Sequence, residues 1–188
     1  IEPELARELI QSLSLRPCRG ATAAWPWPVK IRALGGFDVK RADGPLEISG
    51  RTPFKVLEML RRLVAAGPKG LSVIALSDSL WPDADGDSAQ MSFRTTVHRL
   101  RRLLGCDAAL RTQEGKAMLD RASCWIDVFE FEALVDNITL PSNAVGTSID
   151  PAIQKALALY AGPLMPDKTV SEIAIQRETG VRALRAIL

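Results

Sequence analysis

The spacing of apolar residues divides the chain into segments of different periodicity. Residues 1–16 carry leucines at helical spacing and predict a helix that belongs to an upstream region. The next segment contains Trp25-Pro26-Trp27-Pro28, in which each proline excludes its predecessor from the helical conformation. We therefore predict an extended linker over residues 17–28 and a domain boundary at its end.

An alternation of apolar and polar residues replaces this pattern from Val29 onward. Residues 29–33 alternate as in a strand, and after two glycines the alternation resumes at residues 37–39. The sequence Asp43-Gly44-Pro45 has turn chemistry and precedes a further short strand over residues 46–48. These features predict a small antiparallel sheet.

Two helical patterns follow the predicted sheet. Thr52 has the character of an N-cap, Pro53 suits the first helical position, and a Gly-Pro pair ends this first helix. Ser72 is predicted to cap the second helix, which a Trp-Pro pair stops after Leu80. The second helix is therefore short.

The third helix carries the clearest pattern. Asp87 and Gln90 have the spacing of a capping box, and Gly105 ends the helix after Leu104. A narrow apolar stripe is expected to face the core, formed by Ala89, Phe93, Val97, Leu100 and Leu104. The remaining faces are basic, and no acidic residue occurs between Ser88 and Gly105.

Strand patterns return after the third helix. Residues 110–113 and 116–119 flank Glu114-Gly115 and predict a hairpin with a tight turn, which is the wing of a winged helix. Residues 124–126 predict one more strand, and Asp127 and Glu130 are expected to cap the helix that follows. Further amphipathic helices are predicted from Asp150-Pro151 and over residues 170–188.

Together these elements predict an α+β fold. Residues 29–121 form a winged helix-turn-helix domain with an N-terminal antiparallel sheet and a C-terminal hairpin. Residues 122–188 form an all-α segment of helical repeats.

The third helix and the hairpin supply the candidate contacts to DNA. Arginine binds phosphate oxygens or the O6/N7 edge of guanine with paired donors, and the major groove admits one helix. The candidate residues are Trp81, Ser92, Arg94, Thr95, His98, Arg99, Arg101, Arg102, Arg111, Thr112 and Lys116. The expected base readers are Arg94, Thr95, His98 and Arg99, and the expected phosphate ligands are Trp81, Arg101 and Arg102.

Each of these interpretations has a structural alternative. A run of arginines can be a solvated face, His98 can be an exposed residue without a task, and Trp81 can serve core packing. The cations of the hairpin can be solvated surface residues. The acidic loop over residues 82–87 can contact a partner protein, or it can stabilise the positive end of the third helix.

Composition narrows the class of protein. Hydrophobic residues at 47% and charged residues at 24% are typical of a soluble globular protein, and no apolar run is long enough to cross a bilayer. Cys18, Cys106 and Cys124 lie far apart and are expected to be reduced, structural thiols. A single histidine excludes a histidine-based metal cluster, and no nucleotide-binding or nucleophile motif occurs. We expect no enzyme activity and no cofactor.

Several motifs resemble a known family of bacterial regulators. The motifs are Val29-Lys-Ile-Arg-Ala-Leu-Gly-Gly-Phe-Asp-Val39, Arg51-Thr-Pro-Phe-Lys55, Leu80-Trp-Pro-Asp-Ala-Asp-Gly86 and Thr95-Thr-Val-His-Arg-Leu-Arg-Arg-Leu-Leu-Gly105. They resemble the DNA-binding domain of SARP/AfsR-type regulators, which is similar to the OmpR/PhoB-type winged helix. Downstream, Trp125-Ile-Asp127, Phe131-Glu-Ala-Leu134 and Ala158-Leu-Tyr-Ala-Gly-Pro-Leu164 resemble the start of a bacterial transcriptional activator domain. The Trp-Pro linker is similar to that of larger MalT-like regulators.

The resemblance implies a function and partners. It implies that the third helix is a recognition helix and that the loop over residues 82–87 faces RNA polymerase. We therefore expect a cytoplasmic, sequence-specific binder of double-stranded DNA, a transcriptional activator that binds as a homodimer or in tandem, with no membrane partner. The alternative is a winged-helix module for protein–protein interaction that does not bind DNA.

Overall fold

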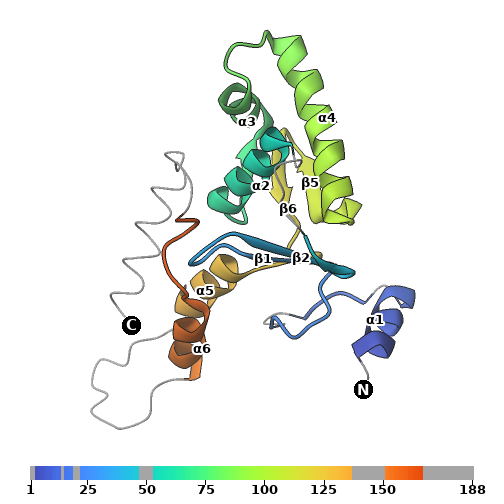
Figure 1. Cartoon of the computed structure of the whole chain (residues 1–188), viewed down its shortest axis with the longest axis vertical. Coiled ribbons are helices and arrows are strands. Elements are labelled where there is room, and N and C mark those ends of the chain that lie inside the picture. The colour runs from blue at the N-terminus through green and yellow to red at the C-terminus, as the bar shows by residue number, and fades with distance from the viewer. Residues whose placement is uncertain (1–2, 14, 19–21, 47–52, 137–150, 167–188) are drawn as a thin grey trace.

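The computed structural model describes residues 3–13, 15–18, 22–46, 53–136 and 151–166. In Figure 1, a group of helices with a hairpin lies above a sheet, and further helices lie below that sheet. The helices are α1 Pro3–Ser12, α2 Phe54–Ala66, α3 Val73–Leu80, α4 Gly86–Leu104, the 3-10 turn η1 Asp107–Ala109, α5 Asp127–Asp136 and α6 Pro151–Leu159. The strands are β1 Val29–Arg32, β2 Asp38–Arg41, β3 Gly44–Pro45, β4 Leu71–Ser72, β5 Leu110–Gln113, β6 Lys116–Leu119 and β7 Cys124–Ile126.

The lower sheet has the strand order β3-β2-β1-β7. β1 pairs with β2 in antiparallel fashion, with Ile31 opposite Val39, as the alternation predicts. The predicted antiparallel sheet is confirmed for β1, β2 and β3, and β7 pairs with β1 in parallel, with Ile126 beside Ile31, which the sequence did not predict. A parallel partner arrives from a distant point of the chain, and local alternation carries no signal for its direction.

The turn after β2 also differs from the prediction. Gly44 and Pro45 form the edge strand β3, and residues 42–43 make the turn. Proline is tolerated there because an edge strand has no further neighbour that needs its N–H. The predicted strand over residues 46–48 extends beyond the described residues after Leu46.

The second sheet contains the predicted hairpin. β5 and β6 have the predicted bounds, and their turn residues Glu114 and Gly115 have φ angles of 52° and 71°. Two successive residues with positive φ are typical of the type I′ turn, whose twist matches that of the paired strands. The short strand β4 pairs with β6 and joins the hairpin to the start of α3. A strand of two residues is too short to show an alternation of apolar and polar positions, so the sequence did not predict β4.

The helix ends confirm some of the predicted caps and correct others. Ser72 caps α3, because its hydroxyl accepts a hydrogen bond from the Ala75 N–H at 3.5 Å. Asp85, and not Asp87, caps α4, since its carboxylate accepts from the Ser88 N–H at 2.8 Å. Gly105 ends α4 in the left-handed conformation, as predicted.

The start of α2 and the linker before β1 need correction too. Pro53 is the N-cap residue of α2 instead of its first helical residue, and the predicted cap Thr52 lies outside the described residues. The linker does not run straight, because the Trp25 N–H bonds the Thr22 carbonyl. The indole of Trp27 donates to that same carbonyl and is buried. Burial of the tryptophan holds this segment on the domain.

One hydrophobic core joins the helices α2 to α6 and the two sheets, whereas Leu5 and Leu9 of α1 are exposed. The predicted stripe of α4 is buried throughout, and Thr96 is buried beside it. It packs with apolar residues of α2, α3, both sheets and α5. In the described part of the chain no helix is both long and apolar enough to span a bilayer.

The segment after α6 returns to the lower sheet. Leu34 and Leu164 form an antiparallel bridge, and the Gly35 N–H donates to the Pro163 carbonyl at 2.8 Å. The predicted division of the chain at residues 121/122 stays a prediction, although hydrogen bonds between β1 and β7 cross it. The predicted helix over residues 170–188 lies outside the described residues.

Asp127 is the first residue of α5, and its carboxylate does not make the predicted capping bond to the second or third N–H of the helix. The buried carboxylate instead accepts from the N–H of the adjacent Val128 at 2.7 Å and from the N–H groups of Ala33 and Leu34 at 2.9–3.0 Å. Burial raises the pKa of this carboxyl, and the three backbone donors oppose that shift. The carboxylate therefore joins the end of β1 to the start of α5.

Candidate DNA interface

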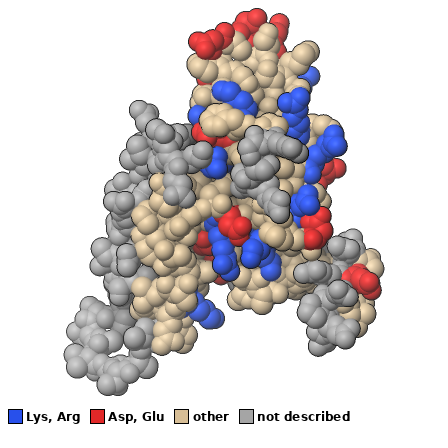
Figure 2. All heavy atoms as spheres, viewed as in Figure 1, with Lys and Arg blue, Asp and Glu red and all other residues tan. Residues whose placement is uncertain are grey.

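The side of α4 away from the core is exposed and basic. The apolar stripe occupies one face, so the other faces carry Arg94, Thr95, His98, Arg99 and Arg102, all of them exposed. Lysine and arginine side chains gather along the flank that α4 forms in Figure 2. Periodicity alone predicts this arrangement, and the structure confirms the exposure of these side chains.

A groove lies between α4 and the hairpin. It has a volume of about 300 Å³, and its floor contains Phe93 and Val97. Of the predicted contact residues, it brings together Arg94, His98, Arg101 and Thr112. The predicted residues that do not line it are Trp81, Ser92, Thr95, Arg99, Arg102, Arg111 and Lys116. The groove therefore joins part of the basic side of α4 to the hairpin.

Gln90 is a groove residue that the sequence analysis missed. It is exposed and lies one turn before Arg94 and two turns before His98 on the same side of α4. The capping-box interpretation assigned it to the helix end, but Asp85 caps the helix and leaves Gln90 without that role. The spacing of Gln90, Arg94 and His98 at intervals of four residues was the available signal.

Arg101 is engaged within the protein. Its Nε and Nη2 atoms donate to the Leu110 carbonyl at 3.2 and 2.8 Å, and its side chain is half-buried. It therefore ties the last turns of α4 to the first residue of β5. For the predicted role as a phosphate ligand, Arg101 is left with three N–H donors, two on Nη1 and one on Nη2.

We expect Arg101→Ala to lower the free energy of unfolding by about 1–2 kcal/mol, because two bonds from a charged donor are lost. Arg101→Lys retains one donor group, so its free energy of unfolding is expected to lie between those of the wild type and Arg101→Ala. Urea denaturation measures the change, and hydrogen exchange of the β5 and β6 amides locates it. An unchanged stability together with weaker binding to every duplex would instead identify Arg101 as a phosphate ligand.

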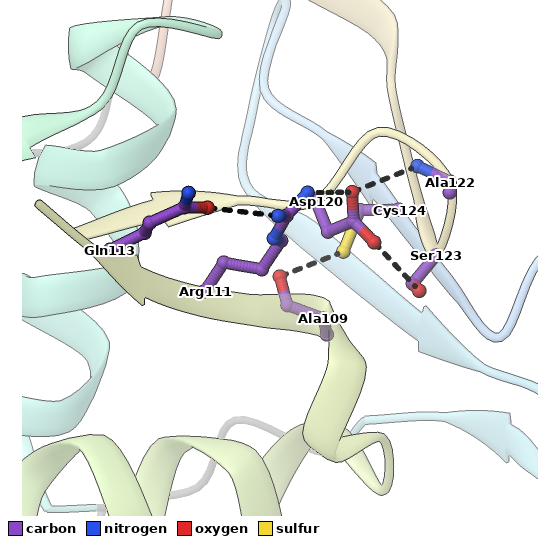
Figure 3. Close-up of polar contacts among 7 residues, drawn as sticks. All are labelled: Ala109, Arg111, Gln113, Asp120, Ala122, Ser123 and Cys124. Atoms are coloured by element: carbon purple, nitrogen blue, oxygen red, sulfur yellow. Dashed lines mark hydrogen bonds and ion pairs between the residues drawn. The ribbon is translucent and has the colours of Figure 1, made fainter. Parts of the chain in front are cut away.

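Arg111 of the hairpin is held from two sides, as Figure 3 shows. Its Nη2 donates to the Gln113 side chain at 3.0 Å, and its Nη1 lies 3.8 Å from the Asp120 carboxylate. Asp120 in turn accepts from the Ala122 N–H and the Ser123 hydroxyl in the turn before β7. These contacts orient the Arg111 guanidinium, and because the side chain is 54% exposed, it remains accessible from solvent. Thr112 and Lys116 are exposed on the same hairpin.

Trp81 and Ser92, like Arg101, are less accessible than the remaining candidates. Both are half-buried, and Trp81 packs against the core, in agreement with the packing alternative. Lys55, which the sequence analysis did not consider, donates its Nζ to the Leu80 carbonyl at the end of α3. Such a cation satisfies a free carbonyl at the negative end of the helix.

The lower sheet contacts the far end of α4. Arg41 of β2 donates Nη1 to the Leu103 carbonyl at 3.4 Å, while Nη2 binds Asp43 at 2.8 Å. A guanidinium at a helix C-terminus is favourable because the terminal carbonyls are partly negative. The N-terminal sheet therefore braces the helix from below.

The loop before α4 is acidic. Asp83, Asp85 and Asp87 are exposed, and acidic side chains mark the tip of the molecule in Figure 2. The Ser88 N–H bond holds the pKa of Asp85 below its usual value. Asp85 and Asp87 lie at the positive end of α4, in agreement with the helix-dipole interpretation.

The cysteines only partly follow the prediction. Cys124 is buried, burial raises the pKa of its thiol, and its Sγ donates to the Ala109 carbonyl. Cys106 is half-buried, but Cys18 is exposed, so the expectation of a structural role for all three is wrong for Cys18. Cys18 follows a proline in the segment before β1, where apolar periodicity gives no guide to burial.

Comparison with known proteins supports the fold. No family model matches the chain, and no curated protein matches it in sequence. Its structure is similar to that of Mycobacterium tuberculosis EmbR in complex with a low affinity phosphopeptide, with a TM-score of 0.56 and 18% sequence identity. The similarity covers 86% of this chain but only 43% of the EmbR chain. The predicted α+β winged-helix fold is confirmed.

Proposed function

We propose that this chain binds double-stranded DNA in a sequence-specific manner, with α4 in the major groove, as part of a transcriptional regulator. The observation that carries the proposal is the exposed basic side of α4, which meets the hairpin in one groove. A helix of this kind fits the major groove, and a flanking hairpin can follow the adjacent backbone. The proposal assigns no catalytic step to the chain.

The proposed roles follow from side-chain chemistry and exposure. Gln90 and Arg94 suit direct readout, because glutamine pairs with the N6/N7 edge of adenine and arginine with the O6/N7 edge of guanine. Thr95, His98 and Arg99 complete the reading surface, and Arg102, Arg111, Thr112 and Lys116 are proposed backbone contacts. Trp81 and Ser92 are peripheral, since both are half-buried.

The similarity to EmbR supports the fold on which the finer parts of the proposal rest. We place the chain among SARP/AfsR-type regulators and propose that it activates transcription in the bacterial cytoplasm. The acidic loop over residues 82–87 is the proposed contact with RNA polymerase, and tandem or dimeric binding is proposed on DNA. The MalT-like parent protein suggested by the linker remains part of this proposal.

Selection of bound duplexes from a random library tests the proposal most directly. We expect an enriched sequence that binds at least about 10³-fold more tightly than random duplex at the same salt concentration. Failure to enrich any sequence, with no binding to random duplex, would favour the protein-interaction module. The chain is then expected to retain its fold and to bind a protein through the same basic side.

The salt dependence of binding tests the proposed phosphate contacts. Each neutralised phosphate contributes about −0.9 to the slope of log affinity against log salt concentration. We expect Arg102→Ala and Lys116→Ala each to reduce the magnitude of that slope by about 0.9, on selected and random duplexes alike. If neither substitution changed the slope, neither residue would contact a phosphate, and both assignments to the interface would be wrong.

A further inference from the structure

A second pocket lies away from the basic side of α4. It has a volume of about 290 Å³ and is formed by the segment before β1, the turn before β7, β7 itself and the start of α5. This volume is at the low end of the range of roughly 300–1,000 Å³ found for ligand sites. The apolar part of its lining includes Trp27, Trp125 and Phe129. The proposed DNA contacts do not line it, so it needs its own explanation.

One wall residue has an unsatisfied hydrogen-bond donor. Trp125 is 5% exposed, and its buried indole Nε1 has no hydrogen-bond partner among the described residues. Buried donors without an acceptor are rare in folded proteins. Trp27 makes a useful contrast, because its Nε1 donates to the Thr22 carbonyl at 2.9 Å.

The charged residues of the pocket favour an anion. Arg16 and Arg121 are both exposed, and neither forms an ion pair with a carboxylate in the described part of the chain. Glu130 also lines the pocket and is half-buried, so the cations outnumber the anions by one. Aromatic walls with two free guanidinium groups fit a ligand that has a flat apolar body and a single negative charge.

We propose that this pocket binds a small planar aromatic carboxylate. The ring system lies among Trp27, Trp125 and Phe129, and the carboxylate faces Arg16 and Arg121. Residues 121–122 directly follow Asp120, whose carboxylate holds Arg111 of the hairpin (Figure 3). The ligand therefore contacts the turn that also orients a side chain of the proposed DNA interface.

The test uses 1-naphthoate and its neutral analogue 1-naphthamide, which match in size and differ in charge. The indole N–H signals of the ¹⁵N-labelled full chain are followed by NMR, and Trp125→Phe assigns the signal of Trp125. We expect saturable binding of naphthoate that shifts the Trp125 signal and is at least about fivefold tighter than binding of the amide. No DNA is present, so this result is independent of the proposed DNA binding.

Substitutions decide whether the two arginines recognise the charge. Arg121→Gln is expected to remove the preference for naphthoate over naphthamide, whereas Lys69→Gln, an exposed control between α2 and β4, is expected to retain it. Should Arg121→Gln disturb the remaining NMR spectrum, Arg16→Gln provides the same comparison. The absence of saturable naphthoate binding, or equal affinity for acid and amide in the wild-type chain, would overturn the proposal.

Discussion

Arg94→Ala is expected to weaken binding to the selected duplex by about 1–3 kcal/mol, or roughly 5- to 150-fold, and to leave binding to random duplex almost unchanged. Arg94 is exposed near the middle of α4 and lines the groove beside the hairpin. A bidentate contact to guanine is lost only on duplexes that carry that guanine. The expected signature is therefore a loss of specificity at one base position.

Competition binding at fixed salt concentration measures this effect, with selected and random duplexes titrated in parallel. Lys155→Ala is the matched control, because it removes one positive charge from the exposed surface of α6, far from α4 in Figure 1. The control is expected to change neither affinity measurably. Equal losses on both duplexes would assign Arg94 to the backbone and leave base readout to other residues, such as Gln90.

Local sequence signals predicted the parts of the fold that depend on one element at a time. The buried stripe of α4, its end at Gly105, the hairpin bounds and the cap at Ser72 all follow from periodicity or from the chemistry of a single residue. Each of these features is determined by residues that lie close together in the sequence. The exposed basic side of α4 follows for the same reason, since burial of one stripe leaves the others at the surface.

The features that escaped prediction are made by residues far apart in sequence. The parallel pairing of β7 with β1, and the bonds that Asp127 accepts from the N–H groups of Ala33 and Leu34, each join segments about 94 residues apart. Asp127 was expected to cap its own helix, and nothing nearby in the sequence indicates its second set of donors. Similarly, Arg101 was assigned to DNA because its acceptor, the Leu110 carbonyl, is a backbone atom with no sequence signature.

Gly35→Ala is expected to lower the free energy of unfolding by about 2 kcal/mol or more. Gly35 has a φ of 78°, where an L-residue with a Cβ pays roughly 1–2 kcal/mol. An added Cβ would also lie 2.6 Å from the Ala161 carbonyl oxygen, which is too close for any real contact and involves backbone on both sides. Relief requires the segment after α6 to move away from the sheet, which weakens the bond from the Gly35 N–H to the Pro163 carbonyl.

Gly36→Ala is the matched control, because a Cβ at this neighbouring glycine meets nothing within 4 Å. Its stability is expected to stay the same or to rise by up to about 1 kcal/mol, since alanine restricts the unfolded chain. Urea denaturation compares the two variants, and hydrogen exchange at Met165, whose N–H binds the Ala33 carbonyl, reports on the docked segment. Equal stability of the two variants would show that this segment does not dock on the sheet at Gly35. If the segment docks on the sheet as described, Gly35→Ala loosens residues 161–165, and the affinity of α4 for DNA is expected to stay unchanged in the folded protein.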